Sequence, residues 1–215
     1  NKALIAKHGD HLAKLAEINN VNLEFEASVA GGIPILKTIK EGLATNQIKK
    51  VYGILNGTTN YILTTMKEEN LNFDDVVNLA QSKGYTSESE SELDIGGLDS
   101  AHKLTLLSTL CFGAEINFLN NDIIGINEIQ IEDILNADKL GYKIKLISEA
   151  STINDSIYCA TSPKLIRKDH PLANVDGVLN AINITTDHLS SLFLAGEGAG
   201  GLATASSIMS DIYEI

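Results

Sequence analysis

Residues 84–110 read GYTSESESELDIGGLDSAHKLTLLSTL, and the rest of the chain is organised around this stretch. Its first half places four acidic side chains at alternate positions, which are Glu88, Glu90, Glu92 and Asp94. Its second half follows a Gly-Gly step, carries Asp99 and Lys103, and is otherwise almost wholly apolar. An acidic loop followed by a charged pair on an apolar helix is more typical of a reaction site than of a solvated surface.

The second half predicts a helix, because its apolar residues recur at spacings of three and four: Leu98, Ala101, Leu104, Leu107, Leu110 and Cys111. Asp99 falls in the first turn, where a carboxylate suits the positive helix end, and Lys103 follows on the same face. Such a pair is most often an exposed ion pair contributing about 0.3–0.5 kcal/mol. On a mostly buried helix, however, a lysine needs partners, and a positioned ammonium can donate a proton to a carbonyl oxygen.

The acidic run has three interpretations. On composition alone it is a solvated loop. A calcium loop of the EF-hand type needs Gly at its sixth position and Glu at its twelfth; counted from Glu88, these positions hold Leu93 and Asp99. The calcium interpretation therefore fails. A carboxylate that holds the ammonium group of a substrate remains open.

Composition narrows the class of protein. The 215 residues can bury a substantial core and form one or two domains, and 44% hydrophobic with 5% aromatic residues fits a compact enzyme. A net charge of -12 argues against nucleic acid and anionic membranes as partners. Cys111 and Cys159 lack metal spacing and are expected to be reduced core residues of a cytoplasmic protein. Neither a signal peptide nor a membrane-length apolar run is present, and a start at Asn1 is consistent with a piece of a longer protein.

Periodicity predicts an α+β fold, a mixed β-sheet covered by helices on one face. Helices are expected at 1–19, 34–44, 57–66, 73–83, 97–112, 131–140 and 204–215. Strands are expected at 21–25, 50–56, 123–129, 142–150, 156–161, 177–186 and 190–195. The other face of the sheet needs a cover, and the sheet of a second copy across a two-fold axis is one solution.

Two glycine-containing turns are further candidates. The strand at 50–56 runs into Gly57-Thr58-Thr59, where free backbone N–H groups at a helix start suit a phosphate or carboxylate. The alternative is a plain helix cap by Thr58 or Thr59. Residues 196–201, GEGAGG, match a dinucleotide-binding pattern but lack the strand and acidic residue that should follow. That loop either brings N–H groups to a phosphate or nicotinamide, or is only a tight turn.

Five segments together carry a resemblance: FEASVAGGIPI at 25–35, GILNGTTNYIL at 53–63, GGLDSAHKL at 96–104, KDHPLANVDGVLNAI at 168–182 and GEGAGGLATAS at 196–206. In this order and over nearly the whole chain, they resemble homoserine dehydrogenase. That family reduces L-aspartate 4-semialdehyde to L-homoserine with NADPH or NADH, on the route to threonine, methionine and isoleucine. The resemblance implies an oxidoreductase that acts on a small amino-acid aldehyde, with NADP or NAD as its cofactor.

Carried over by position, the resemblance assigns roles to individual residues. It makes Lys103 the proton donor to the aldehyde oxygen, Asp99 its partner, and Lys2 a second active-site lysine near the cofactor. It places four residues on the substrate side, which are Glu88, Asp94, Gly57 and Thr58. Gly198 belongs to the loop that closes near the cofactor. Some members hold a sodium or other monovalent ion at positions that match Glu26, Val29, Gly31 and Ile33.

The chain also departs from the family. The family's Glu-Ala-Asp-Pro is replaced by Ser-Glu-Ser-Glu-Ser-Glu, with one extra residue, so Glu90 could replace Glu88 as the group that holds the substrate's amino end. Residues 1–22 match the trailing part of a Rossmann-type nucleotide-binding domain, 23–197 the substrate, catalytic and dimerisation domain, and 198–215 a helix that returns to the first domain. The fragment alone is therefore expected to be inactive. Alternatives are a non-catalytic homodimerisation module or a related two-domain oxidoreductase for another small aldehyde.

Overall fold

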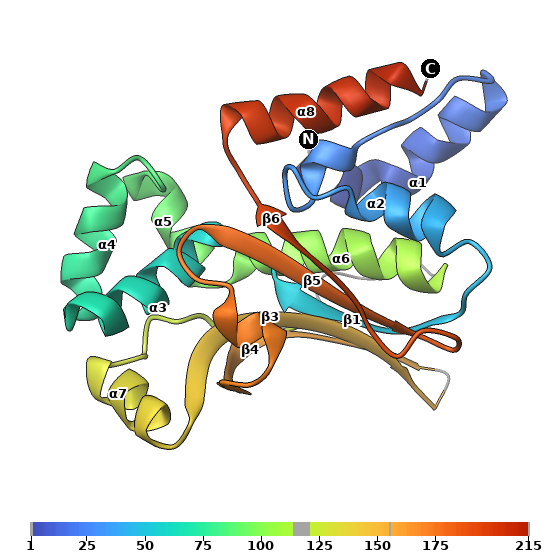
Figure 1. Cartoon of the computed structure of the whole chain (residues 1–215). Helices are drawn as coiled ribbons and strands as arrows, with labels where there is room; N and C mark the ends of the chain where they lie inside the picture. Colours follow the sequence, from blue (N-terminus) through green and yellow to red (C-terminus); the bar gives the residue numbers. More distant parts are fainter. Residues whose placement is uncertain (1, 114–120, 155, 215) are drawn as a thin grey trace.

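The computed structural model describes residues 2–113, 121–154 and 156–214 (Figure 1). Over these residues the strands form one six-stranded sheet in the order β2-β4-β3-β1-β5-β6. The strands are β1 (Ile48–Ile54), β2 (Asp122–Ile123), β3 (Tyr142–Ile153), β4 (Ser156–Arg167), β5 (Leu179–Thr186) and β6 (Leu192–Glu197). The pairing of β2 with β4 is parallel and the other pairings are antiparallel, so the sheet is mixed as predicted.

The helices gather mainly on one side of this sheet, with α6 against it and α1, α2 and α8 beyond (Figure 1). They are α1 (Lys2–Ile18), α2 (Ile35–Lys37), α3 (Gly57–Glu69), α4 (Phe73–Ser82), α5 (Glu88–Ile95), α6 (Leu98–Phe112), α7 (Ile131–Lys139) and α8 (Gly201–Tyr213). Shorter turns are the 3-10 helices Glu26–Ser28 and Pro171–Asn174 and the π-helical turn Thr38–Gly42. The α+β class predicted from the sequence is confirmed. None of the helices in the described ranges combines the length and apolar character that crossing a bilayer requires.

The largest hydrophobic core lies between α6 and the sheet. Leu104 and Leu107 of α6 are fully buried, and they share this core with Val51, Ala150 and Ile184. Val51 pairs with Ala150 of β3 on one side and with Ile184 of β5 on the other, so the three side chains present one row to the helix. This packing explains why the stripe of apolar residues in the sequence is a buried helix face.

Strand β1 lies in the middle of the sheet and delivers the chain to α3. The chain leaves the strand at Leu55 and Asn56, both buried, and turns directly into the helix. The side chain of Asn56 accepts a hydrogen bond from the backbone N–H of Thr59 at 2.8 Å, which makes Asn56 the N-cap of α3. The predicted cap by Thr58 or Thr59 is wrong, because the preceding asparagine already satisfies the free N–H group.

The acidic stretch is a helix, so the predicted loop is wrong. Ser87 caps α5 by accepting from the N–H of Glu90, and the carboxylates of Glu88 and Glu90 fall in the first turn, where the helix dipole favours negative charge. The helix ends at Gly96, and Gly97 takes a left-handed φ of 83° that turns the chain into α6. The junction between α5 and α6 therefore holds the acidic residues close to the start of α6.

Two predicted strands are also wrong. Residues 21–25 have no regular secondary structure and join no strand of the described sheet. Of residues 123–129, only Ile123 is in a strand, which is β2. A Cβ at Gly125 would lie 2.3 Å from the carbonyl oxygen of Ile95, so the chain leaves the sheet there to pass against the end of α5.

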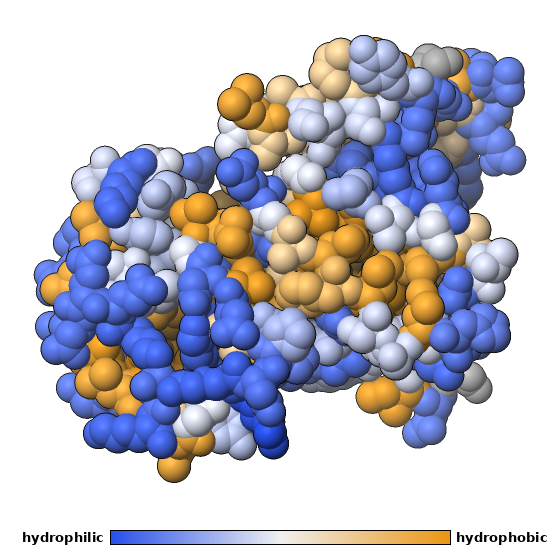
Figure 2. Space-filling view, viewed as in Figure 1, coloured by the Kyte–Doolittle hydropathy of each residue, from blue (hydrophilic) through white to orange (hydrophobic). Residues whose placement is uncertain are grey.

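The edge strand β6 carries an apolar surface. Figure 2 shows hydrophobic side chains gathered over β5 and β6, below α8. Leu192, Phe193 and Leu194 of β6 are only partly buried against the core clusters. In the described part of the chain β6 has β5 as its one neighbour in the sheet, so its outer edge is unpaired.

Candidate active site

A cavity of about 680 Å³ lies where α1, α3, α5 and α6 meet the loop that follows β6. All of the predicted catalytic, substrate and cofactor residues except Glu88 line it: Lys2, Gly57, Thr58, Asp94, Asp99, Lys103 and Gly198. These residues come from distant parts of the sequence. Glu88 is exposed at the start of α5 and does not line the cavity, whereas Glu90 does.

Lys103 is held by two acceptors. Its Nζ atom lies 2.8 Å from Asp99 Oδ2 and donates to the carbonyl oxygen of Leu55 at 2.8 Å. The side chains of Lys103 and Asp99 are only 11% and 10% exposed. An ammonium group has three N–H donors, and these two acceptors occupy two of them, so the third is available to the cavity that Lys103 lines.

Asp99 also binds a second ammonium group. Lys2 Nζ lies 2.5 Å from Asp99 Oδ1, on the opposite carboxylate oxygen from Lys103. Burial alone would raise the pKa of Asp99, but Lys103 and Lys2 outweigh burial and hold that pKa well below its ordinary value. Asp99 therefore remains a carboxylate throughout the physiological pH range and keeps both lysines at the cavity wall.

Asp94 has the opposite balance of forces. Its carboxylate accepts from Asn56 Nδ2 at 2.7 Å and from Thr86 Oγ1 at 3.0 Å. Burial and the nearby charge of Asp99 nevertheless raise the pKa of Asp94 above its ordinary value. The two carboxylates at this wall are therefore unequal, and Asp94 is the one more easily protonated.

Asn56, which the sequence analysis did not assign to the site, also lines the cavity. The sequence does carry a signal for the capping role of Asn56, since an asparagine between a strand and a helix is a common N-cap. His102 and Tyr85 were missed as well, and both line the cavity. Burial lowers the pKa of His102, which favours its neutral form.

The loop after β6 closes the cavity through glycine contacts. A Cβ at Gly198 would lie 2.1 Å from the side-chain carbon of Asn180, so this position has room for glycine only. Asn180 in turn donates to the carbonyl oxygen of Leu55 at 3.1 Å, the same atom that accepts from Lys103. The loop, Asn180 and the ammonium of Lys103 are thus joined through one carbonyl group.

The predicted monovalent-ion site lies near α8. Glu26 is 2% exposed, and its two carboxylate oxygens accept from the N–H groups of Leu36 at 2.7 Å and Lys37 at 2.8 Å. Burial raises the pKa of Glu26 despite these hydrogen bonds. The carbonyl oxygens of Gly31 and Ile33 already accept one hydrogen bond each, from Ser207 and Ile35. Each keeps a second lone pair of the kind that a hard cation uses, and the ion site itself stays a prediction.

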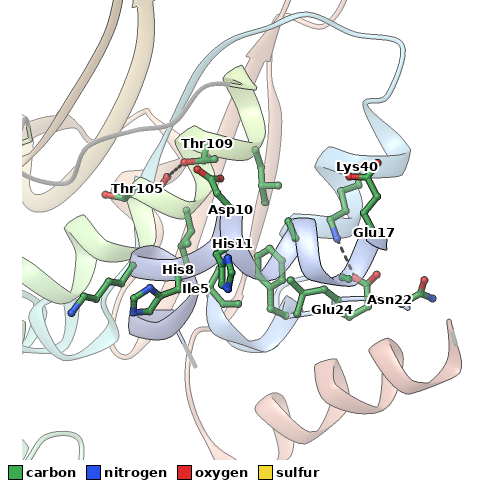
Figure 3. Close-up of a pocket in the computed structure, with 18 of the residues that line it drawn as sticks. Ile5, His8, Asp10, His11, Glu17, Asn22, Glu24, Lys40, Thr105 and Thr109 are labelled. Carbon is green, nitrogen blue, oxygen red and sulfur yellow. Dashed lines mark hydrogen bonds and ion pairs between the residues drawn. The ribbon is translucent and has the colours of Figure 1, made fainter. Parts of the chain in front are cut away.

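A second cavity of about 630 Å³ lies between α1, α6 and the segment that follows α1 (Figure 3). His8, Asp10 and His11, which line it, are exposed residues of α1. Lys40 and Glu24 at the far end pair with each other at 3.1 Å (Figure 3). This cavity gathers none of the predicted site residues and no buried carboxylate, so the first cavity is the stronger candidate for chemistry.

Known homoserine dehydrogenases match this chain in both sequence and structure. The profile of the family described as homoserine dehydrogenase matches residues 34–213. A homoserine dehydrogenase of Neisseria gonorrhoeae is 44% identical over the whole chain, which covers 49% of that relative. The crystal structure of a homoserine dehydrogenase from Thiobacillus denitrificans matches with a TM-score of 0.95 at 42% identity, over 99% of this chain and 49% of that one.

The chain belongs to the homoserine dehydrogenase family. A hyperthermophilic archaeal homoserine dehydrogenase in complex with NADPH also matches, with a TM-score of 0.86 at 31% identity over 100% of this chain and 61% of the other. The chain spans about half the length of the curated relatives that it matches. The family match at residues 34–213 includes every predicted site residue that lines the first cavity except Lys2.

Proposed function

We propose that this chain is the catalytic and substrate-binding part of an NAD(P)-dependent homoserine dehydrogenase, which reduces L-aspartate 4-semialdehyde to L-homoserine. The observation that carries the proposal is the ammonium group of Lys103. Asp99 and Leu55 hold two of its N–H donors, and the third is available to the cavity. A positioned proton donor at a water-restricted wall is what reduction of an aldehyde requires from the protein.

In the proposed reaction, Lys103 gives a proton to the aldehyde oxygen as negative charge develops there. Asp99 holds the ammonium in place and does not itself transfer the proton, because the two lysines keep it ionised. Lys2, on the other oxygen of Asp99, adds positive charge to the same wall. When bound, the nicotinamide cofactor supplies the hydride, and the protein supplies position, charge and a proton.

The remaining polar groups suit the amino-acid end of the substrate. Gly57 and Thr58 open α3, where backbone N–H groups and the helix dipole favour the α-carboxylate. Asp94 and Glu90 line the same cavity and suit the α-ammonium group. The family resemblance, counted back from Lys103, favours Glu88 for this role, whereas the lining of the cavity supports Glu90 instead.

The cavity also suits one end of a nicotinamide cofactor. Gly198 and Gly200 give the mouth of the cavity a wall of bare backbone, which a flat ring can approach closely. Lys2 also lines the cavity, and its ammonium group suits a phosphate or an amide oxygen. A cofactor of that size needs further binding surface, which we assign to a nucleotide-binding domain of Rossmann type that packs against residues 1–22 and 198–215.

The proposal includes two accessory features. A sodium or other monovalent ion would be held by Glu26 and the carbonyl groups of Val29, Gly31 and Ile33, where it would fasten the segment before α2.

The enzyme would work as a cytoplasmic homodimer, since the unpaired edge and partly buried leucines of β6 suit a second copy. Sedimentation of the complete enzyme tests the homodimer, and a monomer at micromolar concentration would contradict it.

The proposed activity is tested by following NADPH and NADH consumption with L-aspartate 4-semialdehyde in the complete enzyme. Saturable oxidation of the cofactor that depends on this aldehyde is expected, with the reverse reaction on L-homoserine. A panel of other small aldehydes separates this function from that of a related oxidoreductase. A dimer that oxidises neither cofactor would favour the alternative of a non-catalytic dimerisation module.

A further inference from the structure

We propose that Asn56 is a positioning residue that joins the two site carboxylates, Asp94 and Asp99, and sets the charge of the substrate side of the cavity. The proposal rests on the proposed function and deepens it. Asn56 Nδ2 donates to Asp94 Oδ1 at 2.7 Å and to Asp99 Oδ2 at 3.0 Å. Asn56 Oδ1 meanwhile accepts from the N–H of Thr59.

Only one orientation of the side-chain amide satisfies this environment. The two carboxylate oxygens are acceptors and need the NH₂ group, while the N–H of Thr59 is a donor and needs the carbonyl oxygen. The side chain is 4% exposed, so water cannot easily replace any of the three hydrogen bonds. Each of the three other common N-cap residues, Asp, Ser and Thr, would satisfy Thr59 and lose the double donor.

The Asn56 amide forms a bridge of two hydrogen bonds between Asp94 and Asp99. This bridge matters because it lies between two buried negative charges. Asp99 is already compensated by Lys2 and Lys103, whereas no described lysine or arginine forms an ion pair with Asp94. Burial raises the pKa of Asp94, the charge of Asp99 raises it further, and the hydrogen bond from Asn56 opposes both. Without that hydrogen bond, Asp94 would take up a proton at higher pH and would no longer attract a substrate ammonium group.

The same side chain also fixes geometry. It connects the β1–α3 junction with the end of α5 at Asp94 and the first turn of α6 at Asp99. The Asp99 oxygen that accepts from Asn56 also accepts from Lys103. Asn56 therefore helps to fix the carboxylate that holds the proton donor, and its own hydrogen bonds go to Asp94, Asp99 and Thr59.

The test uses three N-cap residues of equal capping strength. Asn, Asp and Ser cap helices about equally well, so Asn56→Ser and Asn56→Asp should leave α3 formed. At alkaline pH, Asn56→Ser is expected to lower kcat/KM for aspartate semialdehyde about 10-fold through the loss of a hydrogen bond to a charged group. Asn56→Asp replaces the donor with a third carboxylate and is expected to lower kcat/KM about 100-fold, mainly through KM.

The pH profile distinguishes positioning from stability. In Asn56→Ser, the acidic limb of kcat/KM should move to higher pH, because Asp94 is protonated more easily. The other titratable groups that line the cavity are common to wild type and variants: Lys2, Tyr85, Glu90, Asp99, His102, Lys103 and Glu197. The matched control is Asn60→Ser, since Asn60 is a buried asparagine one turn later that binds the carbonyl groups of Val175 and Leu179 and neither site carboxylate.

Asn60→Ser is expected to lower Tm without shifting the acidic limb of the pH profile of kcat/KM. The inference is overturned if both Asn56 variants keep the wild-type kcat/KM and pH profile, or if Asn60→Ser shifts the limb equally. If either Asn56 variant does not fold, the other still reports on the bridge, and similar Tm values would show that the cap is kept. A wild-type enzyme without activity on aspartate semialdehyde would instead refute the proposed function. The bridge would then be tested by NMR, by comparing the pKa of Asp94 in wild type and in Asn56→Ser.

Discussion

At the scale of single residues, Lys103 is the lysine whose ammonium group is held by Asp99 and Leu55 at the wall of the candidate active site. Replacing Lys103 with Ala removes the proposed proton donor while leaving the cavity open, and it is expected to lower kcat by about 10²–10⁴-fold. Cofactor oxidation by the complete enzyme at saturating aldehyde gives the measurement. Lys139→Ala is the control, because Lys139 is an exposed residue of α7 that does not line the cavity. A kcat close to wild type in Lys103→Ala would remove the lysine from the mechanism.

The two cysteines give a second prediction at this scale. Burial raises the pKa of the Cys111 thiol to about 12, and burial also raises the pKa of Cys159. A raised thiol pKa means that the reactive thiolate is scarce at neutral and mildly alkaline pH. Alkylation of the native enzyme should therefore be slow at both positions, and unfolding in guanidinium should release both. Rapid labelling of Cys111 in the native state, located by mass spectrometry, would contradict this environment.

At the scale of elements, the loop between β6 and α8 offers a matched pair of glycines. Gly198→Ala would place a methyl group 2.1 Å from the buried side chain of Asn180, so the loop or Asn180 must move. The expected cost is about 1–3 kcal/mol of overpacking, together with a fall in kcat/KM of at least about tenfold, because Asn180 and Lys103 share the Leu55 carbonyl.

Gly201→Ala is the control for that substitution. Apart from its chain neighbours and the backbone of its own helix, no described atom lies within 4 Å of a Cβ at Gly201, which begins α8, so alanine should be neutral or slightly stabilising. The test compares Tm and steady-state kinetics of the two variants, and only Gly198→Ala is expected to lower stability and kcat/KM. Equal behaviour of the two variants would show that the contact with Asn180 is unimportant.

The elements also show what the sequence can and cannot predict. The buried helix α6 was predicted correctly because its apolar period is long and continuous. The alternate acids of α5 predict a loop, whereas the helix that forms depends on the Ser87 cap and the helix dipole. The isoleucines of residues 123–129 predict a strand, but contact with Ile95 sets the path of this segment, and single-sequence patterns carry no signal for such contacts.

The site shows the same division. Asp99 and Lys103 share one helix turn, so their pairing was predictable from spacing. The contact of Lys2 with Asp99 joins residues at opposite ends of the first hundred positions, and only the family resemblance pointed to it. The role of Asn56 depends on where two other helices place their carboxylates, so its N-cap signal alone could not reveal the bridge.

At the scale of the whole molecule, α1 and α8 carry large apolar side chains that the described chain leaves exposed: Leu4, Leu15, Ile18, Leu202, Ile208, Met209, Ile212 and Tyr213. These helices lie within residues 1–22 and 198–215, the segments against which we propose that a nucleotide-binding domain packs. If that domain covers them, the chain of residues 1–215 alone should bind NADPH at least about 100-fold more weakly than the complete enzyme. Titration of cofactor fluorescence measures both affinities, and equal affinities would refute the division into domains.

A double substitution on α8 tests the same cover, because its cost in stability should differ between the chain of residues 1–215 and the complete enzyme. Ile208 and Ile212 lie one turn apart on α8 and are 47% and 55% exposed in the chain of residues 1–215. Replacing both with Ser should leave the stability of that chain nearly unchanged and reduce its binding of hydrophobic dyes, because exposed apolar surface is lost. In the complete enzyme the same change should cost about 2–5 kcal/mol for each side chain that the domain buries. Chemical denaturation of both proteins, with and without the double substitution, gives the comparison. A loss of the same size in both would mean that this face of α8 stays exposed in the longer protein, and the proposed docking of a nucleotide-binding domain on α8 would fail.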